Sequence, residues 1–230
     1  MLLLTMLVAV LGVDSPPTTA PADLSAAPPH EFVDGIAVIE AESFVAQSAD
    51  DIRRWYVQST DGMAEVEGRD DDATDPATAS CGAYIEILPD TRVTHNDEIT
   101  GGLNFSNKPG VMGVLSYPVK FDEPGRYYVW ACAHSVGSED NGVHIGLNDD
   151  WPESGRRIQW CAGKHKWTWS SNQRVPQKHC GDPLTVWLDI EEPGVHMVTL
   201  SMREDGVELD RFLLTKDKAL NPNRDPLPGE

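Results

Sequence analysis

Positive charge is scarce in this sequence. Lysine and arginine number 18 against 37 aspartates and glutamates, which gives a formal net charge of −19. A chain with this balance should repel nucleic acid and anionic membrane surfaces, whereas a cation, a neutral sugar or a basic partner is easier to accommodate. A surface selected only for solubility explains the same excess of acid. The charge therefore excludes partners without choosing one.

Long apolar runs are also lacking after the first thirteen residues, MLLLTMLVAVLGV. That run is too short to span a bilayer comfortably and fits the hydrophobic part of a signal peptide, although the usual basic residues before it are missing. We expect a signal peptide, complete or truncated, over residues 1–22 and a linker rich in Pro and Ala over residues 23–35. This predicts an extracellular or periplasmic protein without membrane insertion after signal removal.

Catalytic motifs are absent as well. The sequence has no GxSxG, no HExxH and no phosphate-binding glycine loop, and its 7 histidines are scattered. The many carboxylates make chance acid–base pairs inevitable. A polysaccharide lyase on a β-sandwich would need a proton acceptor beside a cationic cleft, and no cationic cluster is visible along the chain. We expect a non-catalytic protein, with a glycan-active enzyme such as a lyase as the alternative.

The 4 cysteines fit an exported protein. Zinc is not indicated, because there is no CxxC and no matching histidine pair. Three pairings are possible. We favour Cys161–Cys180, since it closes a tryptophan-rich polar stretch that otherwise lacks a core, and such a closure contributes about 3 kcal/mol on the chain-entropy model. Whether Cys81 and Cys132 pair stays open.

Short strands separated by Pro and Gly turns dominate residues 36–216. The expected strands are 36–44, 82–88, 112–120, 126–134, 142–148, 184–190, 195–202 and 207–215. A helical period is missing, apart from a turn or two at 48–54. This pattern predicts an all-β fold, an antiparallel β-sandwich or jelly roll. The polar segment 217–230 is expected to be a linker or a disordered end.

The stretch VIEAESF, residues 38–44, places two acids inside an expected strand. If it is extended, Glu40 and Glu42 share one face about 7 Å apart. Like charges this close repel, and burying them unpaired is costly. A bound calcium ion would make the pair favourable. Solvated glutamates on an exposed edge, or a salt bridge to Arg211, are the alternatives.

Three motifs, IEAESF, EPGRYYVW and MREDGVELDRFLLT, follow one another in an order that resembles carbohydrate-binding module families 6 and 35. The resemblance covers residues 36–216 and implies a galactose-binding-domain-like jelly roll whose first strand lies beside the last. It also implies a structural Ca²⁺ ion bound by Glu40, Glu42 and Asp210. The stretch from Asn141 to Cys180 is longer than a minimal module of this kind requires.

The resemblance further implies a glycan site in the loops at one end of the sandwich. Sugars bind through aromatic faces and planar polar side chains. The matching positions, with further candidates from the long loop, are Trp55, Tyr56, Trp167, Trp169, Arg203, Glu204 and Asp205, then Asp140, Asn141 and Trp151. The family usually has an asparagine before the last strand, and this chain does not. Trp167 and Trp169 also fit a cap on the core, and Trp130 and Trp187 are expected inside it.

The sequence therefore predicts a secreted, non-catalytic module that binds a polysaccharide or oligosaccharide through loop aromatics. A neutral or only locally recognised glycan suits the net charge of −19. The module would work alone or beside a separate carbohydrate-active enzyme. A structural or adhesive surface module that binds protein is the remaining alternative.

Overall fold

Short strands build nearly all of the regular structure in the computed structural model, which describes residues 27–68 and 73–229. The expected signal peptide at 1–22 lies outside these residues. The first sheet contains β2 (Ala46–Ser48), β5 (Val114–Phe121), β7 (Gly142–Leu147), β8 (Ile158–Gln159) and β11 (Gly194–Met202). The second contains β1 (Ile36–Glu40), β3 (Arg54–Ser59), β4 (Ala83–Leu88), β6 (Gly125–His134), β9 (Thr168–Ser170), β10 (Trp187–Ile190) and β12 (Glu208–Thr215).

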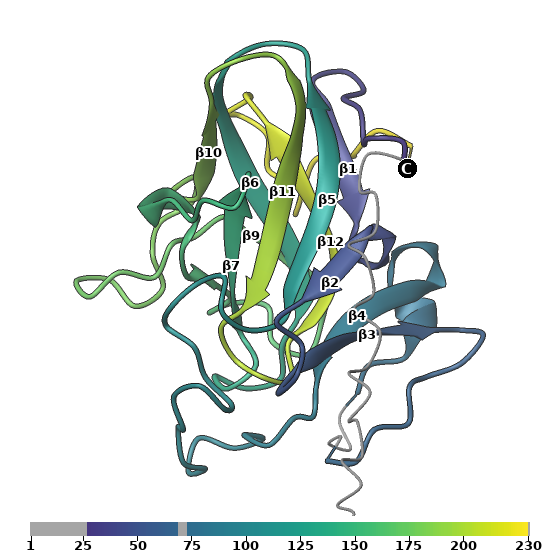
Figure 1. Ribbon diagram of the computed structural model, residues 1–230, viewed down its shortest axis with the longest axis vertical. Coiled ribbons are helices and arrows are strands. Elements are labelled where there is room, and N and C mark those ends of the chain that lie inside the picture. The colour runs from purple at the N-terminus through teal and green to yellow at the C-terminus, as the bar shows by residue number, and fades with distance from the viewer. Residues whose placement is uncertain (1–26, 69–72, 230) are drawn as a thin grey trace, which may run out of the picture.

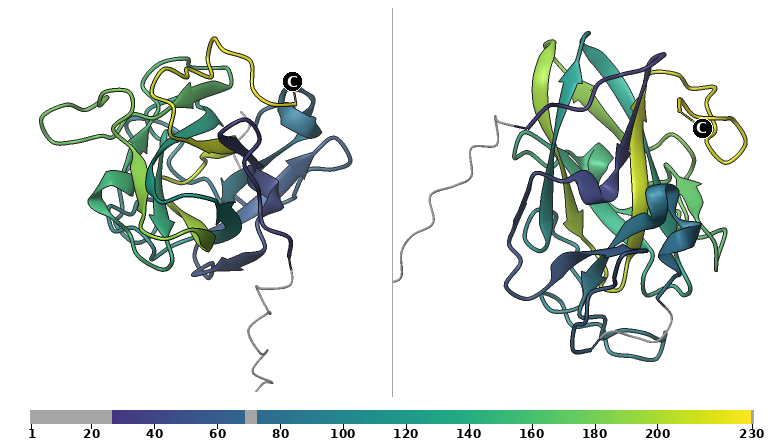
Figure 2. Two further views of the ribbon diagram at one scale, coloured as in Figure 1. Left: turned by 90° about the horizontal axis from the view of Figure 1, so that it is seen from above. Right: turned by 90° about the vertical axis from the view of Figure 1, so that its right-hand side faces the viewer.

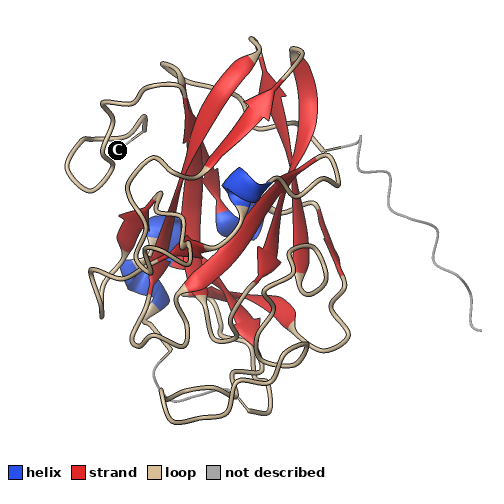
Figure 3. Ribbon diagram, turned by 90° about the vertical axis from the view of Figure 1, so that its left-hand side faces the viewer, coloured by secondary structure: helices blue, strands red, loops and turns tan. Residues whose placement is uncertain are grey.

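Four single-turn 3₁₀ helices complete the described elements (Figure 3): η2 (Ala41–Ser43), η3 (Pro76–Thr78), η4 (Ser80–Gly82) and η5 (Glu153–Gly155). Among the described residues, no helix is long and apolar enough to cross a membrane.

The two sheets pack face to face (Figure 1), and every pair of strands within them is antiparallel. One sheet runs β2-β5-β11-β7-β8. The other runs β10-β6-β12-β4-β3, with β1 added on β12 and β9 added on β6. The predicted antiparallel β-sandwich is confirmed, and so is the position of the first strand beside the last.

Alternation along the strands separates two layers of apolar side chains. In β6, Tyr127, Val129 and Ala131 point into the main core between the sheets. Trp130 and Cys132 point the other way, onto the outer face of the second sheet. They belong to a smaller outer cluster, which comprises Trp130, Cys132, Trp169, Leu213, Leu220 and Leu227. Trp187, which was expected inside the core, is instead half-buried beneath the guanidinium of Arg126, 4.3 Å from its ring centroid.

Both flanking segments pack on the sandwich (Figure 2). The chain after Lys216, expected to be a linker, crosses the outer face and buries Leu220 and Leu227. On the N-terminal side, His30 bonds to β5 through its backbone, with His30 N–H to Pro118 O at 2.8 Å and Lys120 N–H to His30 O at 2.9 Å. The described part of the expected 23–35 linker thus lies along the sheet.

The first strand is shorter than predicted. It ends at Glu40, and Ala41–Ser43 turn into η2 instead of continuing extended to residue 44. The reason lies in β12: β1 pairs with its residues 211–215, whereas Leu209 and Glu208 pair with β4. Because β4 occupies the next stretch of the same edge, β1 has no partner beyond Glu40.

Segments with weak patterns also differ from the prediction. The turn or two of helix expected at 48–54 is replaced by the end of β2 and the start of β3. The short strands β2, β3, β8 and β9 were not predicted. Each of them pairs at an edge of its sheet or onto part of a longer strand, so its sequence carries little alternation of its own.

Candidate functional site

A β-bulge in β12 brings acidic and aromatic side chains together on the outer face. The register between β12 and β6 shifts between Leu209 and Arg211, so Asp210 is the extra residue beside the Arg211–Cys132 pair. Glu40 pairs with Arg211 on one side, and Trp169 pairs with Cys132 on the other. Paired residues of antiparallel strands project to the same face. The row therefore joins a carboxylate to a tryptophan across four strands.

The turn η4 lies against the acidic end of this row. The backbone N–H of Ser80 donates to Asp210 Oδ1 at 2.9 Å, and its hydroxyl donates to Glu40 Oε1 at 2.9 Å. The thiol of Cys81 lies 4.0 Å from the same Glu40 oxygen. The other oxygens, Glu40 Oε2 and Glu42 Oε2, are buried and accept no hydrogen bond from the described residues. Buried acceptors without a partner are costly.

Both burial and mutual repulsion act on these carboxyl groups. Burial first, and then the charges of Glu40 and Asp210, raise the pKa of Glu42 to about 7 against a backbone hydrogen bond that lowers it. Burial likewise raises the pKa of Asp210 to about 6, despite the Ser80 N–H and Arg211. Groups that resist ionisation at neutral pH gain most from a cation placed between them.

The three carboxylates are near neighbours but do not form a tight cage. A preformed metal site would hold three ligand atoms within 4.8 Å of one another. Among the described residues, only Cys161, His179 and Cys180 meet this condition, and the three carboxylates do not. Those two cysteines are joined in a disulfide, so this set offers no thiolate to a metal. An ion at the acidic cluster would need the carboxylates to close inward or would use backbone oxygens as well.

A groove with a cavity volume of about 450 Å³ runs from the acidic cluster past two tryptophans. Trp167 is half-buried; its indole N–H donates to Thr78 Oγ1 at 3.0 Å, and its ring contacts Tyr84 at 5.4 Å between centroids. The guanidinium of Arg211 lies 5.4 Å from the ring centroid of Trp169. Asn223 completes the wall. The structure thus brings Trp167 and Trp169 beside Asp210, a proximity that their positions in the sequence do not reveal.

The C-terminal segment fixes this wall of the groove. Asn223 binds the backbone of Trp169 twice: its Oδ1 accepts from Trp169 N–H at 3.0 Å, and its Nδ2 donates to Trp169 O at 2.9 Å. The Asn223 side chain thus makes the two backbone hydrogen bonds that a neighbouring strand would make with Trp169. Asn223 was missed from the sequence, as were Ser80, Cys132 and Arg211, because each lies at the groove only through strand pairing or a turn.

The loop end of the sandwich is closed around the polar residues expected to bind sugar there. Asp205 is fully buried, with Arg53 Nη2 at 3.1 Å and both the N–H and hydroxyl of Thr91 donating at 2.9 Å. Arg203 and Glu204 are also buried and form an ion pair with each other. These side chains hold the loops in place, and little of them faces solvent.

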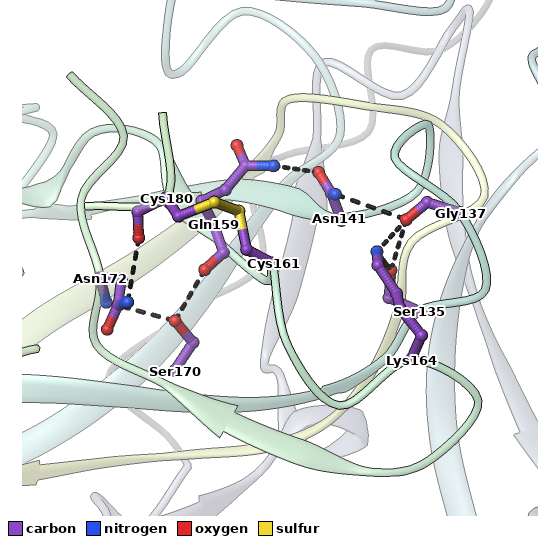
Figure 4. Close-up of a disulfide and its surroundings, with 9 residues drawn as sticks. All are labelled: Ser135, Gly137, Asn141, Gln159, Cys161, Lys164, Ser170, Asn172 and Cys180. Atoms are coloured by element: carbon purple, nitrogen blue, oxygen red, sulfur yellow. Dashed lines mark hydrogen bonds between the residues drawn. A yellow bond between two sulfur atoms is a disulfide. The ribbon is translucent and has the colours of Figure 1, made fainter. Parts of the chain in front are cut away.

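Asn141 and its long loop belong to the same closed region (Figure 4). Asn141 is buried; its backbone N–H donates to Glu204 at 3.2 Å, and its side chain accepts from Gln159. Nearby, the predicted Cys161–Cys180 bridge is present, with 5.6 Å between the Cα atoms. The described part of the chain leaves Cys81 exposed and Cys132 buried as free thiols.

The remaining aromatic candidates lie apart. Trp55 is buried, with its indole N–H donating to Gly113 O at 2.8 Å, so it packs in the core. Tyr56 is half-buried on β3. Trp151 is half-buried in a separate hollow beside Lys108 and Arg156. The predicted aromatics are therefore spread over four places instead of forming one site.

Comparison with known proteins gives one relative in sequence. No family profile matches the chain. An uncharacterized protein of Formosa agariphila is 53% identical over 192 residues, which is 84% of this chain and 46% of that protein. The chain thus spans about half the length of this curated relative.

Solved structures with a similar arrangement include carbohydrate-binding modules. The family 6 module at the C-terminus of a laminarinase from Zobellia galactanivorans has a TM-score of 0.37 at 16% identity, with 79% of this chain and 99% of that chain covered. The Podospora anserina mannanase with a family 35 module has a TM-score of 0.42 at 14% identity, with 83% and 29% covered. With TM-scores below 0.5, these likenesses carry no argument about family or ligand. The antiparallel β-sandwich itself rests on the observed strand pairing.

Proposed function

We propose that this chain is a non-catalytic carbohydrate-binding module that binds a polysaccharide or oligosaccharide in the groove of Trp167 and Trp169. The observation that carries the proposal is the joining of two indoles with planar polar groups, Arg211 and Asn223, in one hollow of about 450 Å³. Volumes of roughly 300–1,000 Å³ are typical of small-ligand sites. Aromatic faces cover the C–H patches of a sugar ring, and planar polar side chains orient its hydroxyls.

A structural calcium ion at Glu40, Glu42 and Asp210 is part of the proposal. Two buried carboxylate oxygens without hydrogen-bond partners and two raised pKa values support it. Calcium prefers carboxylate and backbone oxygens. Bound there, the ion would neutralise the repulsion between the acids and tie β1, η2 and β12 together. It would stand beside the groove and stiffen its floor.

We also propose that the module is exported. A disulfide between Cys161 and Cys180 is stable in oxidising compartments and rare in reducing ones. An apolar N-terminal run of the signal-peptide type supports the same location. The module would act beside a carbohydrate-active enzyme on the same extracellular polysaccharide.

Affinity electrophoresis tests the groove. The wild type is run through gels that contain neutral β-glucan, β-mannan or β-galactan, next to Trp167→Ala and Trp187→Ala. Trp187 is a matched control, because it is half-buried on β10 away from the groove. We expect Trp167→Ala to weaken retention about tenfold or more, as for a central aromatic contact, and Trp187→Ala to leave it unchanged. Equal retention of the two variants would refute the groove, and absence of retention on every gel, including acidic polysaccharides, would refute carbohydrate binding.

A further inference from the structure

A second hollow, of about 460 Å³, surrounds Trp151, which packs over Gly146 of β7. It is lined by Asn107, Lys108, Pro109, Asp150, Trp151 and Arg156. The indole packs against two glycines, where any larger residue would clash with it. A Cβ atom added at Gly110 would lie 2.2 Å from Trp151 Nε1, and a Cβ atom added at Gly146 would lie 2.8 Å from Trp151 Cε3. Two glycines therefore make room for a tryptophan that stays partly exposed.

Arg156 is held in position without using all of its donors. Its Nε and Nη2 donate to the backbone oxygen of Trp151 at 3.1 and 3.0 Å, and its Nη1 pairs with Glu153 at 3.1 Å. A guanidinium has five N–H donors, so two remain for a ligand. The ammonium of Lys108, which is exposed, forms no hydrogen bond or ion pair with the described residues.

Folding gathers further arginines behind this hollow. Arg157 shares Glu153 with Arg156. It is joined to Arg174 by two hydrogen bonds, Arg157 Nε to Arg174 O at 3.1 Å and Arg174 N–H to Arg157 O at 2.8 Å. The charges of Arg157 and Arg174 both reach the buried Arg203, whose Nε lacks a hydrogen-bond partner. Arg156, Arg157, Arg174 and Arg203, which come from three segments, therefore concentrate positive charge in this part of the protein.

A buried histidine links the two walls of the hollow. His144 Nδ1 accepts from the N–H of Arg157 at 3.0 Å, so its Nε2 carries the proton and donates to Ser106 O at 3.0 Å. Burial first, and then the charges of Arg203, Arg157 and Arg156, lower the pKa of His144 to about 3, against the hydrogen bond to Ser106. The imidazole stays neutral and fixes the segment of Asn107 and Lys108 against that of Arg156.

We propose that the Trp151 hollow is a second glycan subsite that recognises an acidic sugar, one that carries sulfate or carboxylate, in an anionic polysaccharide. Trp151 stacks on the sugar ring, Lys108 and the remaining Arg156 donors bind the anionic group, and the amide of Asn107 binds a hydroxyl. The subsite proposal rests on the proposed function of glycan binding. It adds a second binding position and names acidic sugars as the ligand class. The one carboxylate that lines the hollow, Asp150, sets a limit on the affinity.

This subsite revises the expectation of a neutral glycan. Net charge governs the approach of a polyanion at long range, but exposed charges beyond about 8–10 Å are largely screened at physiological salt. The local excess of arginine and lysine then decides binding. The cations at 108, 156, 157, 174 and 203 are dispersed along the sequence, which is why no cationic cluster is visible in it.

Matched polysaccharides test the subsite with the full chain. Affinity electrophoresis compares a sulfated galactan with its desulfated form, and polygalacturonate with its methyl ester, at 50 and 200 mM salt. The variants are Lys108→Gln, Trp151→Ala and Asp150→Asn. Lys120→Gln is the charge-matched control, because Lys120 is exposed on β5 and pairs with Glu31 at 3.0 Å. A single-stranded DNA oligonucleotide serves as a polyanion without acidic sugars.

The expected result is that at least one acidic form is retained more strongly than its neutral counterpart. Lys108→Gln should weaken that retention roughly fivefold, by loss of a charge-assisted contact, and Asp150→Asn should strengthen it, while Lys120→Gln changes nothing. Trp151→Ala should weaken retention of the acidic form more than Trp167→Ala does. Equal retention of acidic and neutral forms, or equal effects of Lys108→Gln and Lys120→Gln, would overturn the subsite. DNA retained as strongly as the acidic glycan would do the same.

The two proposals fail in different ways. Retention of neutral glycans that depends on Trp167, without any preference for acidic forms, refutes the subsite and leaves the groove standing. Retention of an acidic form that depends on Lys108 but not on Trp167 supports the subsite and refutes the groove. If no polysaccharide is retained, both are refuted.

Discussion

Buried carboxylates occur in two parts of the molecule and differ in their counter-charges. At the loop end, Asp205 has Arg53 and Glu204 has Arg203, so acids and bases are matched one to one. Thr91 adds two hydrogen bonds to Asp205. Asp205 Oδ1 and Arg203 Nε have no hydrogen-bond partner, but each acid has a counter-charge, and this pairing completes the packing of the loops.

At the junction of β1 and β12 the balance is different. Glu40, Glu42 and Asp210 lie together, and the guanidinium of Arg211 lies 3.5 Å from the Asp210 carboxylate. Two of their oxygens have no hydrogen-bond partner. The comparison teaches that burial of an acid alone is a poor guide to a binding site. The shortage of counter-charge at β1 and β12 is what supports the proposed ion there, because a ligand could supply the charge.

Breaking the balanced network should have the largest effect. Arg53→Ala leaves Asp205 buried without its cation, and we expect the free energy of unfolding to fall by about 3–5 kcal/mol. Urea denaturation measures this. Arg126→Ala is the control, since Arg126 pairs with Asp189 in solvent and its loss should change stability little. Similar effects of the two variants would show that the loop-end network is not a structural closure.

Binding of the proposed calcium ion should have the next largest effect. Calcium at 100 times its dissociation constant should stabilise the wild type by about 2.7 kcal/mol, and the melting temperature with and without chelator measures this. Glu42→Gln should reduce or abolish the response, whereas Glu31→Gln, which changes an exposed acid, should retain it. Identical melting curves of the wild type in calcium and in chelator would rule out the ion.

The pH dependence sharpens the same point. The folded-state pKa of Glu42, about 7, is above its ordinary value of 4.5, so stability without calcium is lost as pH rises through this interval. In chelator at pH 8, Glu42→Gln should therefore exceed the wild type by about 1–2 kcal/mol, after allowance for solvent screening of a half-exposed group. Urea denaturation at pH 5 and pH 8 tests this, and a gap that does not widen with pH contradicts it.

A pH effect of similar size concerns the buried His144 of β7. Its pKa is lowered from 6.5 to about 3, so the unfolded chain takes up a proton below pH 6.5 while the folded chain does not. Stability should fall by about 1.4 kcal/mol per pH unit from this group as pH drops toward 3. The difference in unfolding free energy between the wild type and His144→Asn, followed from pH 7 to 5, measures it. A difference that is constant over this range would contradict a neutral, buried imidazole.

The strands were predictable where apolar and polar residues alternate over a long run. In β6 the side chains of Tyr127 and Val129 point into the main core and that of Trp130 points to the outer face, so the alternation was predictable, whereas the expectation of Trp130 inside the core was wrong. The end of β1 was not predictable, because it depends on β4 occupying the edge of β12, more than 160 residues away in sequence from Glu40. The local sequence pattern of a strand does not show which other strand pairs with it.

The candidate site was predictable in its residue types but not in its assembly. Asp210, Trp167 and Trp169 were selected from motifs, yet their meeting in one groove results from the bulge at Asp210 and from pairing of β9 with β6. No glycine or proline marks that bulge in the stretch VELDRF. Trp55 was misleading for the opposite reason: an aromatic after the first strand can serve the core equally well.

The edge of β12 that receives both β4 and β1 has a consequence for local opening. β4 pairs with Glu208 and Leu209, β1 pairs from Arg211 onward, and Asp210 is paired in neither register. β1 and β4 are thus hydrogen-bonded to separate stretches of β12, and either can detach without the other. Amide hydrogen exchange should then release β1 as a unit of its own, before β4, with an opening free energy that reports directly on whatever bridges Glu40 and Asp210.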